Sequence, residues 1–191
     1  VLAAGFDKNA IALQGLEALG FGFIETGTVT SQEQAGNPRP RIFRLTKDMA
    51  LINRMGFNNH GAEVISKRIG HTSRLNIPLG ISIGKSKVIL LEKACEDYIF
   101  TLRKVIPFAD YIAINVSSPN TPGLRELQDK KYLDELLCEL TREVREYSER
   151  KKRKLIPVFV KVSPDLTLSA LDELLRVCFD RGVQGIIATN T

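Results

Sequence analysis

The chain has 191 residues, of which 43% are hydrophobic and 26% are charged, and this balance excludes a disordered chain and favours a globular domain with a hydrophobic core. No run of about 18 apolar residues occurs, so the sequence predicts no transmembrane helix. Much of the net charge of +5 comes from a basic run at residues 150–154, where a predicted helix ends. Cations there complement the helix dipole, so we interpret the run as a solvated helix end and expect no nucleic-acid partner.

Cysteine and histidine spacing gives no sign of a metal site. The three cysteines, Cys95, Cys138 and Cys178, are far apart and form no CxxC pair. The two histidines, His60 and His71, have no partner at metal-ligand spacing. We therefore expect reduced structural thiols and no bound metal.

Short apolar segments alternate with helical segments along the chain. The expected strands span residues 1–4, 21–26, 79–83, 111–116, 158–162 and 185–189. Most are continuous apolar runs, which is typical of strands buried on both faces of a parallel sheet. The expected helices span residues 10–19, 61–69, 92–105, 130–148 and 168–181.

The connection between residues 30 and 61 is too long for an ordinary turn. It contains the sequence PRPR at 38–41, followed by two short apolar pieces at 42–45 and 50–52. Loops of this length inside compact domains are usually functional. We expect a small β-hairpin that folds over the mouth of the domain.

Repeated strand-helix units predict an α/β fold, which is either a doubly wound sheet or a (β/α)8 barrel. Polar residues follow the predicted strands all along the chain, at 7–9, 28, 84–85, 115–120, 161 and 190–191. A barrel gathers such groups from many strand ends at one rim, whereas a doubly wound sheet gathers them at one switch point. The sequence therefore predicts a (β/α)8 TIM barrel of which about six βα units are present, with the β-hairpin inserted after strand 2.

Two segments suit a flat, polar ligand. In AAGFDKN, at 3–9, small residues allow a ligand to approach the backbone, and Lys8 is placed to point into the barrel mouth. A tight turn with a solvated lysine explains the same residues equally well. In NRMGFNN, at 53–59, three amides beside an aromatic ring suit a planar heterocycle, and an Asn-rich turn is an equal alternative.

Two further segments are harder to explain by folding alone. In NVSSPNTPGLR, at 115–125, the prolines stiffen a loop rich in hydroxyl and amide groups. A generic rigid loop leaves Asn115 at the strand end unexplained, so a function is favoured. Lys161 lies between two valines near a strand end, where it either meets an anion or extends to the rim.

Together these segments resemble class 2 dihydroorotate dehydrogenases from Leu2 to the end of the chain. AAGFDKN, FIETGTVT, GNPRPRIFRL, INRMGFNN, YIAINVSSPNTPGLR, VKVSPDL and IATNT match the family in order and at compatible spacing. The resemblance implies an FMN-containing barrel that oxidises dihydroorotate to orotate in de novo pyrimidine biosynthesis. It also implies that Ser118 is the catalytic base and that a hydride passes to FMN. Class 1 enzymes have a cysteine at the position of Ser118, so the serine indicates class 2, whose members pass electrons to a quinone.

The resemblance also implies two sets of site residues. The expected flavin contacts are Ala4, Gly5, Thr28, Ser82, Asn115, Lys161 and Thr189. The expected dihydroorotate contacts are Lys8, Asn53, Arg54, Met55, Gly56, Phe57, Asn115, Asn120, Asn190 and Thr191.

The proposed chemistry gives these residue types a purpose. A serine is a poor base at neutral pH, so Ser118 needs a path for its proton, and Thr121 and Phe57 are the candidates for lining it. Lys8 would meet the substrate carboxylate, and Lys161 would offset negative charge on the reduced flavin.

Two features depart from the family pattern. Ser82 and Ser86 stand where the family usually has asparagines, so we expect a bridging water or weaker flavin binding at Ser82. The chain also begins and ends within the expected barrel domain, 1–191. We therefore expect strands seven and eight, the loops that hold the FMN phosphate, and the membrane-associating N-terminal helices of class 2 enzymes to be absent from it.

For the full-length protein, the resemblance implies a peripheral location on an inner membrane. This would be the cytoplasmic face in a bacterium and the mitochondrial inner membrane in a eukaryote. Two alternatives stay open. One is a non-catalytic fragment or diverged ligand-binding homologue, and the other is a different FMN barrel acting on pyrimidines, such as the flavin domain of dihydropyrimidine dehydrogenase. Those relatives use a cysteine base, so Ser118 disfavours the second alternative.

Overall fold

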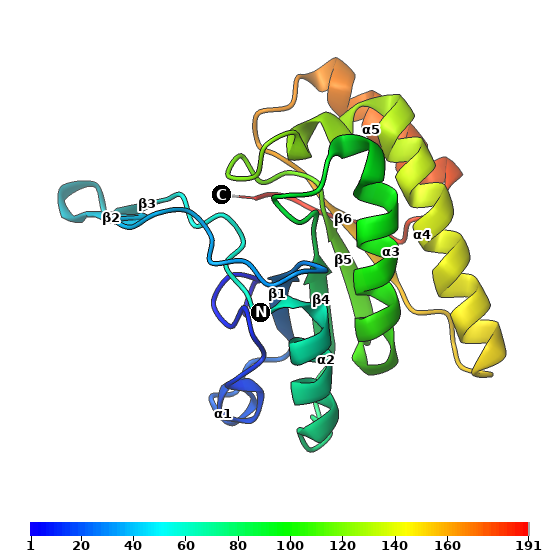
Figure 1. Cartoon of the computed structure of the whole chain (residues 1–191), viewed down its shortest axis with the longest axis horizontal. Helices are drawn as coiled ribbons and strands as arrows, with labels where there is room; N and C mark the ends of the chain where they lie inside the picture. The colour runs from blue at the N-terminus through cyan, green and yellow to red at the C-terminus, as the bar shows by residue number, and fades with distance from the viewer. Residues whose placement is uncertain (191) are drawn as a thin grey trace.

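The computed structural model describes residues 1–190, so the predicted contact by Thr191 lies outside the described residues. Five parallel strands form one sheet in the order β1-β4-β5-β6-β7 (Figure 1). Their bounds are Ile24–Val29, Leu79–Ile83, Tyr111–Asn115, Val158–Lys161 and Gly185–Ile187. Each strand pairs with the next one along the chain, apart from the separate β2-β3 pair. This monotonic order has no switch point, which agrees with a partial barrel and excludes a doubly wound sheet.

Five α-helices connect the strands. They are α1 (Leu13–Ala18), α2 (Gly61–His71), α3 (Ala94–Val105), α4 (Lys130–Arg150) and α5 (Leu168–Asp180). Helices α2, α3 and α4 lie along one face of the sheet (Figure 1). Short 3-10 turns at Thr46–Asp48, Leu91–Lys93, Ile106–Phe108 and Leu124–Gln128 complete the connections. Within residues 1–190, no helix combines the length and the apolar character needed to cross a lipid bilayer.

Two of the expected strands differ from the prediction. Residues 1–4 form only one isolated bridge, in which Leu2 pairs in parallel with Ile24, and not a full strand. The strand expected at 21–26 is β1, which begins and ends three residues later, at Ile24 and Val29. Residues 21–23 precede the first residue that pairs with β4. Backbone hydrogen bonds from the first segment to β1 continue as far as Asp7, but their spacing is irregular, so this segment does not form a full strand.

The strands separate apolar from polar side chains by their alternation. Ile81 pairs with Ile112, and Ile114 pairs with Val160, and these four side chains belong to the hydrophobic core. The alternate positions face the other side of the sheet, which is the inner face of the barrel. That inner face carries Glu25, Ser82, Asn115 and Lys161, all buried. The strands are therefore buried on both faces, and one of the faces is polar.

The predicted β-hairpin is confirmed, and its placement over the barrel mouth stays a prediction. Strands β2 (Ile42–Leu45) and β3 (Ala50–Asn53) pair in antiparallel fashion. Every residue in them is exposed, and the hairpin projects away from the five-stranded sheet (Figure 1). A two-stranded ribbon can bury side chains only against another element, so its pairing does not determine where it lies.

Candidate active site

A hydrogen-bonded chain of side chains joins the carboxyl ends of three strands. Asn115, at the end of β5, donates from Nδ2 to Oγ1 of Thr28 on β1 at 3.0 Å. Thr28 Oγ1 also lies 3.0 Å from Ser82 Oγ on β4. All three side chains are buried. Amide and hydroxyl groups from separate strands are therefore held together at one rim, as the barrel prediction required.

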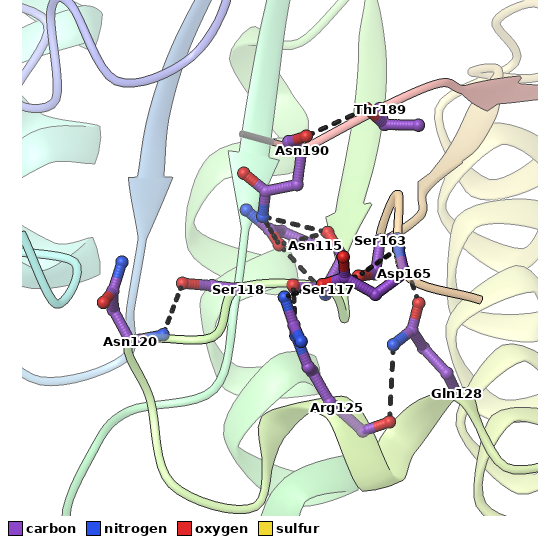
Figure 2. A network of polar contacts seen from close by, with 10 residues as sticks. All are labelled: Asn115, Ser117, Ser118, Asn120, Arg125, Gln128, Ser163, Asp165, Thr189 and Asn190. Atoms are coloured by element: carbon purple, nitrogen blue, oxygen red, sulfur yellow. Dashed lines mark hydrogen bonds and ion pairs between the residues drawn. The ribbon is translucent and has the colours of Figure 1, made fainter. Parts of the chain in front are cut away.

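Asn115 also organises the segment after β5 (Figure 2). Its Oδ1 accepts hydrogen bonds from the backbone N–H and the hydroxyl of Ser117, both at 3.2 Å. Asn190, which follows β7, donates from Nδ2 to Ser117 Oγ at 3.0 Å and to Asn115 Oδ1 at 3.5 Å. Two predicted substrate contacts thus meet at Ser117, which the sequence analysis did not assign to the site. Thr189 is exposed, and its hydroxyl donates to the Asn190 carbonyl at 2.9 Å.

Ser118 is buried at the start of a loop that is anchored at several points. Its Oγ accepts a hydrogen bond from the backbone N–H of Asn120 at 3.3 Å (Figure 2). Arg125 donates from Nε to the Ser117 carbonyl at 3.3 Å and forms an ion pair with Asp165 at 2.8 Å. These contacts restrict the Ser118 hydroxyl to one region of the rim. Such restriction is what a reacting side chain requires.

Thr121 lies three residues beyond Ser118. Its Oγ1 is buried and has no hydrogen-bond partner. A buried hydroxyl without a partner is costly, and in a native protein it calls for an explanation such as a water molecule or a ligand. The role of Thr121 in lining a proton path from Ser118 stays a prediction.

The turn that carries Lys8 is fixed against β1. The Asp7 carboxylate accepts hydrogen bonds from the backbone N–H groups of Ile11 and Ala12, both at 2.9 Å. Gly5 N–H donates to the Gly27 carbonyl at 2.8 Å. Burial lowers the pKa of Lys8, and the positive charges of Arg41 and Lys161 lower it further.

The segment predicted to hold substrate, residues 53–57, is divided by the structure. Asn53 and Arg54 are exposed, and Arg54 donates from Nε and Nη2 to the Pro40 carbonyl at 3.0 and 2.9 Å. Met55 is half-buried, whereas Gly56 and Phe57 are buried. The Phe57 ring packs at Gly84 beside Thr28, since a Cβ built on Gly84 would lie 2.9 Å from that ring and 2.7 Å from Thr28 Cγ2. Only the second half of the segment therefore reaches the rim.

A second polar cluster fixes the loop after β4. Asp97 on α3 accepts hydrogen bonds from the backbone N–H of Ser86 at 2.7 Å, from the Ser86 hydroxyl at 3.0 Å and from the Ser31 hydroxyl. Lys85 is also buried, and its ammonium donates to the carbonyls of Ser86 and Ile89. Ser86, one of the two departures from the family pattern, therefore binds within the protein. The sequence analysis missed Asp97 because it lies inside a predicted helix, where an acidic residue is usually part of a solvated face.

We expect replacement of Asp97 by alanine to lower the free energy of unfolding by about 1–3 kcal/mol, because it leaves the buried Ser86 N–H without an acceptor. Asp97→Asn keeps one carboxamide oxygen in the same place and should lose less. Chemical denaturation of both variants measures the difference. Equal losses would show that the Ser86 N–H is not the group that needs Asp97.

These observations define the class of protein. It is a (β/α) barrel whose strand ends present buried hydroxyl, amide and ammonium groups suited to a polar, planar ligand. Residues 1–191 match the dihydroorotate dehydrogenase family, and the chain belongs to that family.

Individual relatives agree with this assignment. The chain is 54% identical over 190 residues to a dihydroorotate dehydrogenase (quinone) of Chloroflexus aurantiacus, covering 100% of this chain and 52% of the relative. It is 50% identical to a protein of the same name from Gloeobacter violaceus, covering 100% and 51%. The crystal structure of Eimeria tenella DHODH in complex with ferulenol superposes with a TM-score of 0.91 at 40% identity, covering 100% of this chain and 55% of that one.

The predicted resemblance to the quinone-type branch and the predicted partial barrel are thus confirmed. The chain spans about half the length of the curated relatives it matches.

Proposed function

We propose that the protein is a flavin-dependent dihydroorotate dehydrogenase that oxidises dihydroorotate to orotate, with residues 1–191 forming part of its FMN-binding barrel domain. The observation that carries this proposal is the placement of Ser118. Its hydroxyl lies buried on an anchored loop, directly after Ser117 of the Asn115 network at the rim. This arrangement supports a base that is held beside a recognition site for a polar ring.

The donor groups at the rim fit FMN. The edge of a flavin ring carries carbonyl oxygens and ring nitrogens, and it needs several hydrogen-bond donors and a positive charge. Asn115, Thr28, Ser82 and Lys161 offer an amide, two hydroxyls and an ammonium on the inner face of neighbouring strands. These residues would hold the ring beside the backbone of Ala4 and Gly5. When bound, FMN would supply the acceptor for the hydride that leaves C6 of dihydroorotate.

Ser118 would take the proton from C5 of the substrate. Its Oγ already accepts a hydrogen bond from the Asn120 N–H, and that contact favours the deprotonated oxygen. The proton must then leave the buried site. Thr121 has a buried hydroxyl without a partner, and Phe57 covers the rim at Thr28, so these two side chains would line the exit.

The amides would recognise the substrate ring. Asn115 and Asn190 are held together through Ser117, so their remaining polar atoms are pre-oriented. A ring with the wrong pattern of donors and acceptors would leave these groups unpaired, which is costly in a buried site. Asn120, whose side chain points away from this network in Figure 2, would add a further amide contact to the substrate.

Ser82 would bind flavin less strongly than the asparagine usual in the family. It is fully buried, and its Oγ lies 3.0 Å from Thr28 Oγ1. A serine side chain is shorter than that of asparagine, so a bridging water or a weaker contact would replace the direct one.

The alkaline limit of substrate binding follows from Lys8, which would meet the substrate carboxylate. Burial lowers the pKa of Lys8. The lysine therefore loses its charge at a lower pH than a free lysine side chain, whose pKa is about 10.4. Affinity is present below the lowered pKa and is lost as the pH rises through it. We expect KM for dihydroorotate to rise about tenfold across that range.

A Lys8→Arg variant provides the matched control, because a guanidinium keeps its charge throughout. Its KM should be higher than that of the parent protein at neutral pH and should stay level as the pH rises. Parallel KM profiles for the two proteins would exclude Lys8 as the titrating group.

The electron acceptor and location of the full-length protein are part of the proposal. Curated relatives carry quinone in their names, and this supports a quinone as the acceptor for electrons from the flavin. Because quinones reside in membranes, the full-length protein would work at an inner membrane surface. We propose dihydroorotate, orotate and a quinone as its partners.

An anaerobic visible spectrum of the full-length native protein, supplied with FMN, tests the function. Dihydroorotate should bleach the flavin band, and orotate should not. A bound flavin that stays oxidised with dihydroorotate would overturn the proposed substrate. Absence of bound flavin would overturn the proposed cofactor.

A further inference from the structure

A buried carboxylate lies on the inner face of the barrel, on the strand that carries Thr28. Glu25, the second residue of β1, is 4% exposed. Its Oε2 accepts a hydrogen bond from the Tyr111 hydroxyl at 3.1 Å, and its Oε1 is buried without a hydrogen-bond partner. The mechanism above does not use Glu25. A buried carboxylate with one unpaired oxygen is costly, so its presence calls for a reason.

The contact between Tyr111 and Glu25 depends on a glycine. Gly80 on β4 lies between them in the sheet, paired with Glu25 on one side and with Tyr111 on the other. A Cβ built on Gly80 would lie 1.9 Å from Tyr111 Cζ. The tyrosine ring therefore crosses β4 directly over the glycine and delivers its hydroxyl to a strand that is not its neighbour.

Glu25 shares its surroundings with Lys161. Both side chains line one cavity of about 470 Å³, together with Tyr111 and Phe159. Burial raises the pKa of Glu25, whereas the Lys161 charge, the Tyr111 hydroxyl and the Ala4 backbone N–H act to lower it. Burial is the largest of these effects, so the pKa of Glu25 lies above its ordinary value, and the three groups oppose that rise by favouring the carboxylate form. Two of them, Ala4 and Lys161, are residues that the proposed function places against FMN.

We propose that Glu25 is a positioning residue, whose carboxylate offsets the charge of Lys161 and so limits how strongly the protein favours reduced flavin. This inference rests on the proposed flavin site. A lysine alone beside the ring would stabilise the added negative charge of the reduced state. A carboxylate behind that lysine weakens this stabilisation and leaves the flavin able to pass its electrons onward.

The test is the midpoint potential of FMN bound to the full-length native protein and to two variants. Glu25→Gln has the same shape and can still accept from Tyr111, but it carries no charge. Glu25→Asp keeps the charge and serves as the matched control. The potentials are measured with a reducing dye at slightly alkaline pH and without dihydroorotate. Failure of the proposed substrate therefore cannot be mistaken for failure of this inference.

We expect Glu25→Gln to raise the equilibrium constant for two-electron flavin reduction about tenfold, a shift of about +30 mV. Glu25→Asp should shift much less. Equal shifts in both variants, or none in Glu25→Gln, would overturn the proposal. So would a folded Glu25→Gln protein that no longer binds FMN, because removing a negative charge does not weaken the binding of an anion.

A third variant decides the case in which Glu25→Gln does not fold. The double variant Glu25→Gln/Lys161→Gln removes both charges. Recovery of the folded state, measured by its thermal transition, would show that the uncompensated lysine was the cause and would support the pairing. Failure to recover would show that Glu25 serves the fold through other contacts and would overturn the proposal.

Discussion

Replacing Ser118 with alanine is expected to lower kcat for dihydroorotate oxidation by about a hundredfold to ten-thousandfold, the range that a positioned general base contributes. The hydroxyl is buried, and its Oγ accepts a hydrogen bond from the Asn120 N–H. Its removal deletes the proton acceptor and leaves the Asn115 network in place. KM and flavin content should therefore change little.

Steady-state kinetics of the full-length native protein and this variant provide the measurement. Ser169→Ala is the matched control, because Ser169 is exposed on α5 and takes no part in the site. Full activity in Ser118→Ala would exclude Ser118 as the base. A large rise in KM with unchanged kcat would instead indicate a role in binding.

The strand ends explain why much of the site could be predicted from the sequence. Thr28, Ser82 and Asn115 each lie in a predicted strand or just after one, near its carboxyl end, and parallel strands in a barrel bring such positions to one rim. Their hydrogen bonds to one another follow from that convergence. The alternation of apolar and polar segments does not indicate what each residue does. The predicted role of each residue came from the family resemblance.

Other features depend on contacts that a local pattern does not record. Asn53 and Phe57 lie in one motif, yet the first is exposed and the second is buried, because the chain turns inward from the hairpin at Met55 and Gly56. The hairpin itself formed as predicted, whereas its direction depends on what packs against it. Glu25 was visible in the FIETGTVT motif, but its partner Tyr111 is 86 residues away and meets it only across Gly80.

Gly80→Ala is expected to lower the free energy of unfolding by about 3 kcal/mol, although the change adds one methyl group. The new Cβ would lie 1.9 Å from Tyr111 Cζ, so the ring has to move off β4. Its movement would break the hydrogen bond to Glu25 and leave that buried carboxylate with fewer partners. Overpacking and an unpaired buried charge therefore add to each other. Chemical denaturation of the full-length native protein and the variant measures the loss.

Two comparisons separate this cause from a general effect of replacing glycine. Gly15 lies inside α1 with no atom within 4 Å of a built Cβ, so Gly15→Ala should stabilise the protein by about 0.5–1 kcal/mol. Tyr111→Leu removes the ring that the Gly80 methyl would strike. In that background Gly80→Ala should cost much less than in the parent protein, since neighbouring substitutions are not additive when they share a contact. An equal loss of unfolding free energy in both backgrounds would mean that the backbone of β4 and its neighbours excludes the methyl group. Tyr111 would then not be the reason for a glycine at position 80.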